Sequence, residues 1–169
     1  MPHAAHPLPH ADQHAGSSAT DAVTLLPTRV SLLDRLAERT RTADEAPAAL
    51  LLIGLLRRES SWPMPGSHLD RIAAALSADL RGTDWLARSG PVEFAVLLDG
   101  AAPDAETAAH RLVSTVAGAG ADGVTACVGI AALSAAASPS EVHRQATLCL
   151  TAACSVGSGR VIGYSGNRR

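Results

Sequence analysis

The sequence predicts an α+β domain in which helices cover a mixed sheet. From residue 21 onward, the apolar patterns follow the order helix, strand, helix, hairpin, helix, strand, helix, strand. A continuous apolar run at residues 48–56 indicates a buried central strand, and two short apolar segments around a Gly-Pro pair indicate a hairpin. With 169 residues, 47% of them hydrophobic, the chain can form one domain with a substantial core.

The first helix is predicted to run to about Arg41, because apolar residues recur there at helical spacing. Its expected inner face consists of Val30, Leu33, Leu36 and Ala37. The central strand follows from Ala48 to Leu56, between Pro47 and Arg57. Ser67 is expected to cap the second helix. Its inner face is predicted to be Leu69, Ile72, Ala73, Leu76 and Leu80.

The hairpin is predicted from two strands, Trp85 to Arg88 and Glu93 to Leu98. Pro103 and Asp104 are expected to open the third helix, which precedes a strand from Val124 to Leu133. The fourth helix should begin at Ser138, Pro139 and Glu141, which combine an N-cap, a proline at the first helical position and a capping-box glutamate. It should end near Val156, before Gly157 and Gly159, and lead into a last strand from Arg160 to Tyr164.

Residues 1–20 are expected to form a disordered arm ahead of the domain at 21–169, because they lack any hydrophobic period. The arm is rich in proline and alanine and carries four histidines: His3, His6, His10 and His14. These histidines could bind a metal weakly, but no defined ligand geometry is implied, which favours a solvated tail.

The composition argues against nucleic acids and membranes as binding partners. The net charge of −2 gives no basic field for nucleic acid, and no apolar run is long enough to cross a membrane. No secretory leader is recognisable, so a cytoplasmic protein is expected. The spacing of Cys127, Cys149 and Cys154 suggests neither a zinc site nor a disulfide framework, so buried thiols are predicted.

Short motifs at residues 21–29, 90–94 and 146–161 resemble those of the GGDEF family, the diguanylate cyclases. Segment 21–29 is similar to the family's Asp-x-Leu-Thr-Gly-Leu-Pro-Asn-Arg entry, and segment 146–161 follows its closing helix. Residues 90–94 read Gly-Pro-Val-Glu-Phe in place of Gly-Gly-Asp-Glu-Phe. The shared order of these motifs implies a nucleotidyl-cyclase-type fold, a GGDEF-like central mixed sheet flanked by helices.

The resemblance also implies that the cyclase chemistry is absent. Family members hold magnesium on carboxylates, and the matching positions here are Gly54 and Val92. Pro91 removes a backbone donor from the nucleotide cradle, and Cys154 replaces a phosphate-binding lysine. Glu93 is retained, and a structural role is expected for it. These substitutions predict a chain that is not an enzyme, with no catalytic residue, no metal site and no cofactor.

A product-binding motif is retained. Arg81 and Asp84 stand at the family spacing of an Arg-x-x-Asp motif, and Arg111 matches a further arginine of the next helix. In the family these residues bind cyclic di-GMP, whose guanines suit guanidinium donors and a carboxylate acceptor. The resemblance therefore predicts a cyclic di-GMP receptor in bacterial second-messenger signalling, which acts through a protein partner or a ligand-linked homodimer.

Other interpretations remain open at this stage. Arg81 and Asp84 could form only a local salt bridge at a helix end, with Arg111 as a solvated helix residue. The domain could instead be a protein-interaction scaffold that needs no nucleotide, or an allosteric domain that binds GTP. The missing guanine-reading loop and Cys154 argue against GTP binding.

Overall fold

The computed structural model describes residues 19–58 and 63–165. The predicted arm and its four histidines lie outside these residues, apart from Ala19 and Thr20. Those two belong to the folded domain, because Thr20 bridges Pro27 and the Ala19 carbonyl accepts the Thr28 N–H at 2.9 Å. The extent of the arm over residues 1–18 stays a prediction.

The predicted order of elements is confirmed, with small differences at their ends. The four helices are α1 (Arg29–Thr40), α2 (Gly66–Asp79), α3 (Ala102–Gly118) and α4 (Pro139–Val156). The five strands are β1 (Ala48–Arg57), β2 (Trp85–Gly90), β3 (Glu93–Asp99), β4 (Val124–Ala132) and β5 (Val161–Gly163). In the part of the chain that the structure describes, no helix is long and apolar enough to cross a bilayer.

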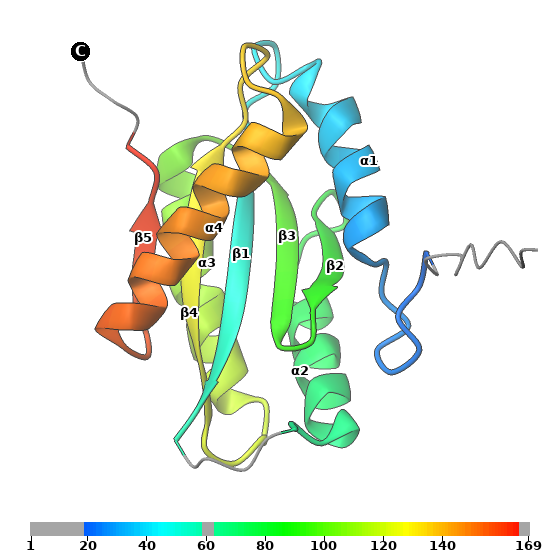
Figure 1. The fold of residues 1–169 in the computed structure, drawn as a ribbon, viewed down its shortest axis with the longest axis vertical. Coiled ribbons are helices and arrows are strands. Elements are labelled where there is room, and N and C mark those ends of the chain that lie inside the picture. Colours follow the sequence, from blue (N-terminus) through cyan, green and yellow to red (C-terminus); the bar gives the residue numbers. More distant parts are fainter. Residues whose placement is uncertain (1–18, 59–62, 166–169) are drawn as a thin grey trace, which may run out of the picture.

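The strands form one mixed sheet, as the sequence predicted, and their order in the sheet is β2-β3-β1-β4-β5. All neighbours are antiparallel except β4 and β5, which are parallel. Helices α1 and α4 cover one face and α2 and α3 the other (Figure 1). The domain is therefore an α+β sandwich with a separate apolar core on each side of the sheet.

Side chains alternate along the strands between these two cores. On β1, Leu51 and Ile53 face α2 and α3, whereas Leu50 and Leu52 face α1 and α4, and all four are fully buried. Aliphatic residues and alanines fill both cores, and the chain's single phenylalanine, Phe94, is also fully buried. Burial on both faces explains why β1 is a continuous apolar run instead of an alternating one.

Two local predictions about the helices were wrong. The buried face of α1 carries Leu32, Leu36 and Thr40, whereas Val30 and Leu33 are exposed. Leucines occupy both positions 32 and 33, so helical spacing alone did not decide which of them faces the sheet. Helix α2 begins at Gly66 after Pro65, and Ser67 lies inside the helix instead of capping it. The N-cap of α4 is confirmed, since the Ser138 side chain accepts the Glu141 N–H at 3.2 Å. The Glu141 carboxylate bonds to Arg144 and Gln145 instead of completing a capping box.

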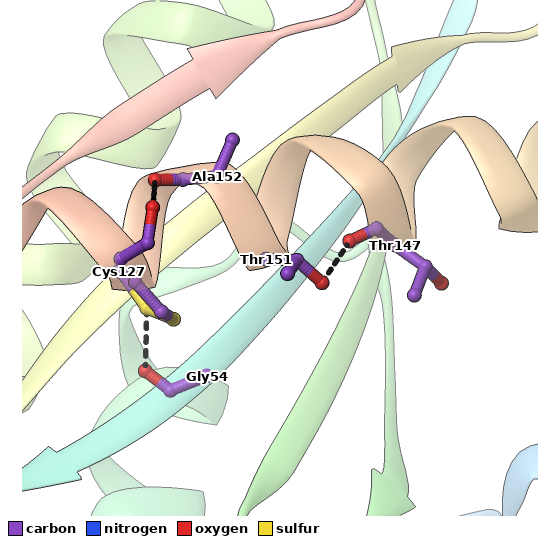
Figure 2. The surroundings of a disulfide bond; sticks show 7 residues. Gly54, Cys127, Thr147, Thr151 and Ala152 are labelled. Atoms are coloured by element: carbon purple, nitrogen blue, oxygen red, sulfur yellow. Dashed lines mark hydrogen bonds between the residues drawn. A yellow bond between two sulfur atoms is a disulfide. The ribbon is translucent and has the colours of Figure 1, made fainter.

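The prediction of three buried thiols was also wrong. Cys127 of β4 and Cys154 of α4 form a disulfide, with their Cα atoms 5.4 Å apart, and only Cys149 remains a free buried thiol among the described residues. Figure 2 shows Cys127 between α4 and β1. Its Sγ lies 3.6 Å from the Gly54 carbonyl oxygen. A disulfide sulfur has no hydrogen to donate, so this is a packing contact.

A partly buried ion pair connects the N-terminal segment to the hairpin. Both carboxylate oxygens of Asp21 accept hydrogen bonds from Arg88 Nη1, at 2.8 and 2.9 Å. Asp21 also accepts from the backbone N–H of Thr24 at 2.7 Å and from its hydroxyl at 2.8 Å. Burial by itself would raise the pKa of Asp21, but the bonds from Thr24 and Arg88 outweigh it and lower the pKa from 3.8 to about 2.

This shift predicts a pH-dependent stability. Because the folded pKa of Asp21 lies below the unfolded one, the stabilisation is complete above about pH 4 and is lost as the pH falls towards 2. Asp21→Asn should cost about 1–2 kcal/mol of unfolding free energy at pH 7, and less at pH 3. Urea unfolding at both pH values measures this difference. Asp70→Asn, at an exposed position of α2, is the control. An equal cost of Asp21→Asn at both pH values would contradict the linkage.

Candidate functional site

Arg81, Asp84 and Arg111 line one cavity of about 100 Å³. It lies where three elements meet: the turn after α2 supplies Arg81, the residue before β2 is Asp84, and α3 supplies Arg111. The structure thus brings together the three residues that the sequence singled out, although they are spread over 31 positions of the chain (81 to 111).

Asp84 is held by the turn that it closes. Its Oδ2 accepts the Arg81 backbone N–H at 2.9 Å, and the Asp84 N–H donates to the Arg81 carbonyl at 3.0 Å. Its Oδ1 is buried and accepts no hydrogen bond in the described structure. A buried acceptor without a partner costs free energy, about 1–3 kcal/mol, unless a ligand or water supplies a donor. Asp84 therefore contributes to the cavity wall a carboxylate that is fixed through Oδ2 and unsatisfied at Oδ1.

Arg111 is held from the other side by the end of α2. Its Nε lies 3.1 Å from Asp79 Oδ1, and its Nη2 donates to the Asp79 carbonyl at 3.2 Å. The Thr115 hydroxyl donates to Asp79 Oδ2 at 2.8 Å and so fixes the carboxylate. The Arg111 side chain is 43% exposed, and its guanidinium keeps donors available at the cavity. Arg111 is thus a positioned residue, in contrast to the solvated helix residue of the simpler interpretation.

The Arg81 side chain does not form the local salt bridge with Asp84 that the simpler interpretation assumes. Among the described residues, no carboxylate lies within 4.0 Å of its guanidinium, and its contact with Asp84 is made by its backbone. In a local salt bridge at the helix end, the side chains of Arg81 and Asp84 would have bound each other. Instead, Arg81 and Asp84 line the same cavity, and Asp84 Oδ1 has no partner among the described residues.

Sequence reasoning missed three residues of this region. Asp79 orients Arg111, and Asp104 and Thr107 of α3 complete the cavity wall. Asp104 was recognised only as a helix-opening residue, and it does accept the Ala101 N–H at 3.2 Å. Its second role depends on how α3 packs beside the turn after α2. Helical spacing could have placed Asp104, Thr107 and Arg111 on one face of α3.

The cavity suits the edge of a planar base more than a whole small molecule. Typical ligand pockets measure about 300–1,000 Å³, well above the 100 Å³ found here. Guanidinium groups donate in a planar fork, and a carboxylate oxygen accepts N–H groups, a combination that matches the acceptors and donors of guanine. A larger ligand would rest across the open surface with one edge in the cavity.

The positions that match the family's magnesium ligands also lie together. The Leu55 N–H donates to the Val92 carbonyl at 2.9 Å, which brings Val92 beside Gly54. A Cβ atom at position 54 would lie 3.1 Å from Leu150 Cδ1 and 3.2 Å from Cys154 Sγ. The retained Glu93 accepts from the Ser89 hydroxyl at 2.6 Å. In the part of the chain described, no group of three His, Cys, Asp or Glu residues could hold a metal ion.

Comparison with solved structures identifies GGDEF domains as neighbours. The GGDEF domain of TpbB (YfiN) from Pseudomonas aeruginosa is 26% identical, with a TM-score of 0.75 over 88% of this chain and 95% of that one. Diguanylate cyclase SiaD from the same organism, in complex with its activator SiaC, is 26% identical, with a TM-score of 0.76. The match covers 86% of this chain and 62% of SiaD.

The GGDEF domain of DgcB from Caulobacter crescentus, solved in complex with c-di-GMP, is 20% identical, with a TM-score of 0.76 over 88% of this chain and 97% of that one. No protein-family model matches the chain. No curated protein matches it either. The structural neighbours confirm a GGDEF-like fold.

The same neighbours contradict the prediction that the chain is not an enzyme. It shares its fold, at 26% identity, with a diguanylate cyclase, which is an enzyme. The loss of side-chain oxygen at Gly54 and Val92 was read as the loss of all activity, but substitutions at family positions are no measurement of turnover. The expectation drawn from them is therefore withdrawn.

Proposed function

We propose that this domain is a cyclic di-GMP receptor, which binds the dinucleotide through Arg81, Asp84 and Arg111. The observation that carries the proposal is that Asp84 lines a cavity together with two arginines and has a buried Oδ1 without a partner among the described residues. The N1–H and N2–H donors of a guanine would satisfy that oxygen, while guanidinium groups would donate to O6, N7 or phosphate. The DgcB complex supports this ligand class for the fold.

Binding is expected to act through association. The cavity is small and open at the surface, so a bound dinucleotide would keep one side exposed to a second protein surface. One structural neighbour has a protein partner, because SiaD was solved in complex with its activator SiaC. For this chain we propose either a ligand-linked homodimer or a protein partner that recognises the loaded site.

Calorimetric titration with cyclic di-GMP tests the proposal. Arg81→Ala removes a charge-assisted donor, and Asp84→Asn keeps the side-chain size but turns one acceptor oxygen into a donor. Each substitution should weaken binding about tenfold or more, since about 1.4 kcal/mol is a factor of ten. Arg71→Ala is the control, because Arg71 lies on α2 and donates to the Gly120 carbonyl outside the cavity.

Light scattering with and without the ligand should show a rise in molar mass if the ligand links two copies. Wild-type protein that gives no heat at high micromolar cyclic di-GMP would rule the receptor out. Variants that bind as tightly as the wild type would rule out this site. If, in addition, no nucleotide raises the melting temperature, the scaffold function takes the receptor's place, since a ligand specific to the folded state must stabilise it.

A further inference from the structure

A second cavity, larger than that of Arg81, Asp84 and Arg111, lies on the face of the sheet that α1 and α4 cover. Residues of α1, of α4 and of the start of β3 line it. It measures about 420 Å³, within the range of small-molecule sites. Its wall combines three charged side chains with apolar ones, and it shares no residue with the cavity of Arg81, Asp84 and Arg111.

Two opposite charges on this wall do not pair with each other. Among the described residues, no carboxylate oxygen lies within 4.0 Å of the Arg29 guanidinium. Glu93 Oε1 accepts a hydrogen bond from the Ser89 hydroxyl, whereas Glu93 Oε2 accepts none from the described residues. Arg29 and Glu93 both line the cavity, so the two charges border the same space. The third charge, Arg144, is already bound by Glu141 through two bonds of 2.8 Å.

His143 supplies a buried acceptor on the same wall. The residue is 9% exposed, and its Nε2 has no partner among the described residues. The Thr147 hydroxyl donates to the His143 carbonyl at 2.9 Å, so the hydrogen on Nδ1 is directed to Thr147 Oγ1 at 3.4 Å. Nε2 is then the bare acceptor of a neutral ring. Burial, and next the charge of Arg29, lower the pKa of His143 against the opposing effect of Glu93.

Ser140 and Thr147 add hydroxyl groups to the wall, and two leucines form its apolar part. Leu33 of α1 and Leu148 of α4 border the cavity and remain 36% and 51% exposed. Any ligand that fits all of these groups carries an anionic end for Arg29, a cationic donor for Glu93 and His143, and an aliphatic part for the two leucines. A simple anion would leave Glu93 opposing it, and a simple cation would meet Arg29.

We propose that this cavity binds a small zwitterion of the α-amino acid class with an aliphatic side chain. The carboxylate would pair with Arg29, and the ammonium group would donate to Glu93 Oε2 and His143 Nε2. The aliphatic side chain would cover Leu33 and Leu148. The site is independent of cyclic di-GMP binding, because it lies on the other face of the sheet and uses different residues.

Titration of the full chain with L-leucine tests the proposal, with binding expected at millimolar concentration or below. Two analogues separate the charged contacts in wild-type protein. 4-Methylpentanoate lacks the ammonium group and leucinamide lacks the carboxylate, so each should bind about tenfold more weakly or worse. Because these comparisons need no substitution, they hold even if a variant folds poorly. Equal binding of leucine and 4-methylpentanoate would overturn the role of Glu93 and His143.

Variants then assign the contacts to residues. Arg29→Gln and Glu93→Gln should each reduce leucine affinity about tenfold and leave the melting temperature of the free protein within a few degrees. Arg35→Gln is the matched control on α1, because Arg35 pairs with Glu38 outside the cavity. The proposal fails if leucine does not bind at millimolar concentration, or if Arg29→Gln binds leucine as the wild type does.

Discussion

Alanine at position 129 is expected to destabilise the domain by about 3 kcal/mol or more, the upper range for overpacking a close-packed core. A Cβ atom at Gly129 would lie less than 3.0 Å from Leu150 N, Ala146 O and Leu150 Cα, all of them backbone atoms of α4. A flexible side chain could rotate away from such a contact, but helix backbone cannot. The whole of α4 would have to move off β4, and Leu150 and Ala146 would leave the core with it.

Thermal unfolding measures this effect. For a domain of this size, about 3 kcal/mol corresponds to a loss of about 6–12 °C in Tm. Gly118→Ala is the matched control: it adds the same methyl group at the end of α3, where nothing lies within 4 Å. We expect that control to be neutral or slightly stabilising, because alanine favours the helix. If Gly129→Ala melts within about 2 °C of the wild type, close approach of α4 is not what requires glycine there.

The sequence predicted the order of elements well because each element carries its own local pattern. The apolar run of β1, the Gly-Pro turn of the hairpin and the Ser138 cap of α4 depend only on neighbours in the chain. The orientation of α1 does not. Leu32 and Leu33 have equal hydrophobicity, and only the position of α1 against β2 and α4 buries Leu32 and exposes Leu33.

The candidate site shows the same division. Arg81 and Asp84 could be recognised because they resemble the short Arg-x-x-Asp motif of GGDEF domains, and Arg111 because of a resemblance in its neighbours. Asp79 and Asp104 were missed because their roles arise where α2 and α3 pack together. The cavity at Arg29 and Glu93 was missed for a similar reason. Its wall joins residues of α1, β3 and α4 that share no local motif.

The disulfide was also missed because it depends on how two elements pack together. Cys127 and Cys154 are 27 residues apart, and their spacing resembles no disulfide framework. They meet because Gly129 lets α4 lie directly on β4, which places the last turns of α4 over Cys127. The interaction between helix and strand, and not the spacing of the cysteines, determines this contact.

We expect the disulfide to be the second large contribution to stability. Closing a loop of 27 residues removes unfolded-chain entropy worth about 3.5 kcal/mol at 25 °C. Under oxidising conditions, Cys154→Ser should therefore lower the unfolding free energy by about 2–4 kcal/mol. Reductant should destabilise the wild type by a similar amount and leave the variant unchanged. Urea unfolding of both proteins, with and without dithiothreitol, measures these four values.

Cys149→Ala provides the control, because Cys149 is the free buried thiol on the same helix. That variant should keep the full response to reductant, although it loses some stability from the smaller side chain. Alkylation of the unfolded, unreduced wild type should modify one cysteine, and alkylation after reduction should modify three. Three alkylated cysteines without reductant, together with equal stability of wild type and Cys154→Ser, would show that the bond does not form in solution. The contact between α4 and β4 would then depend on Gly129 and apolar packing alone.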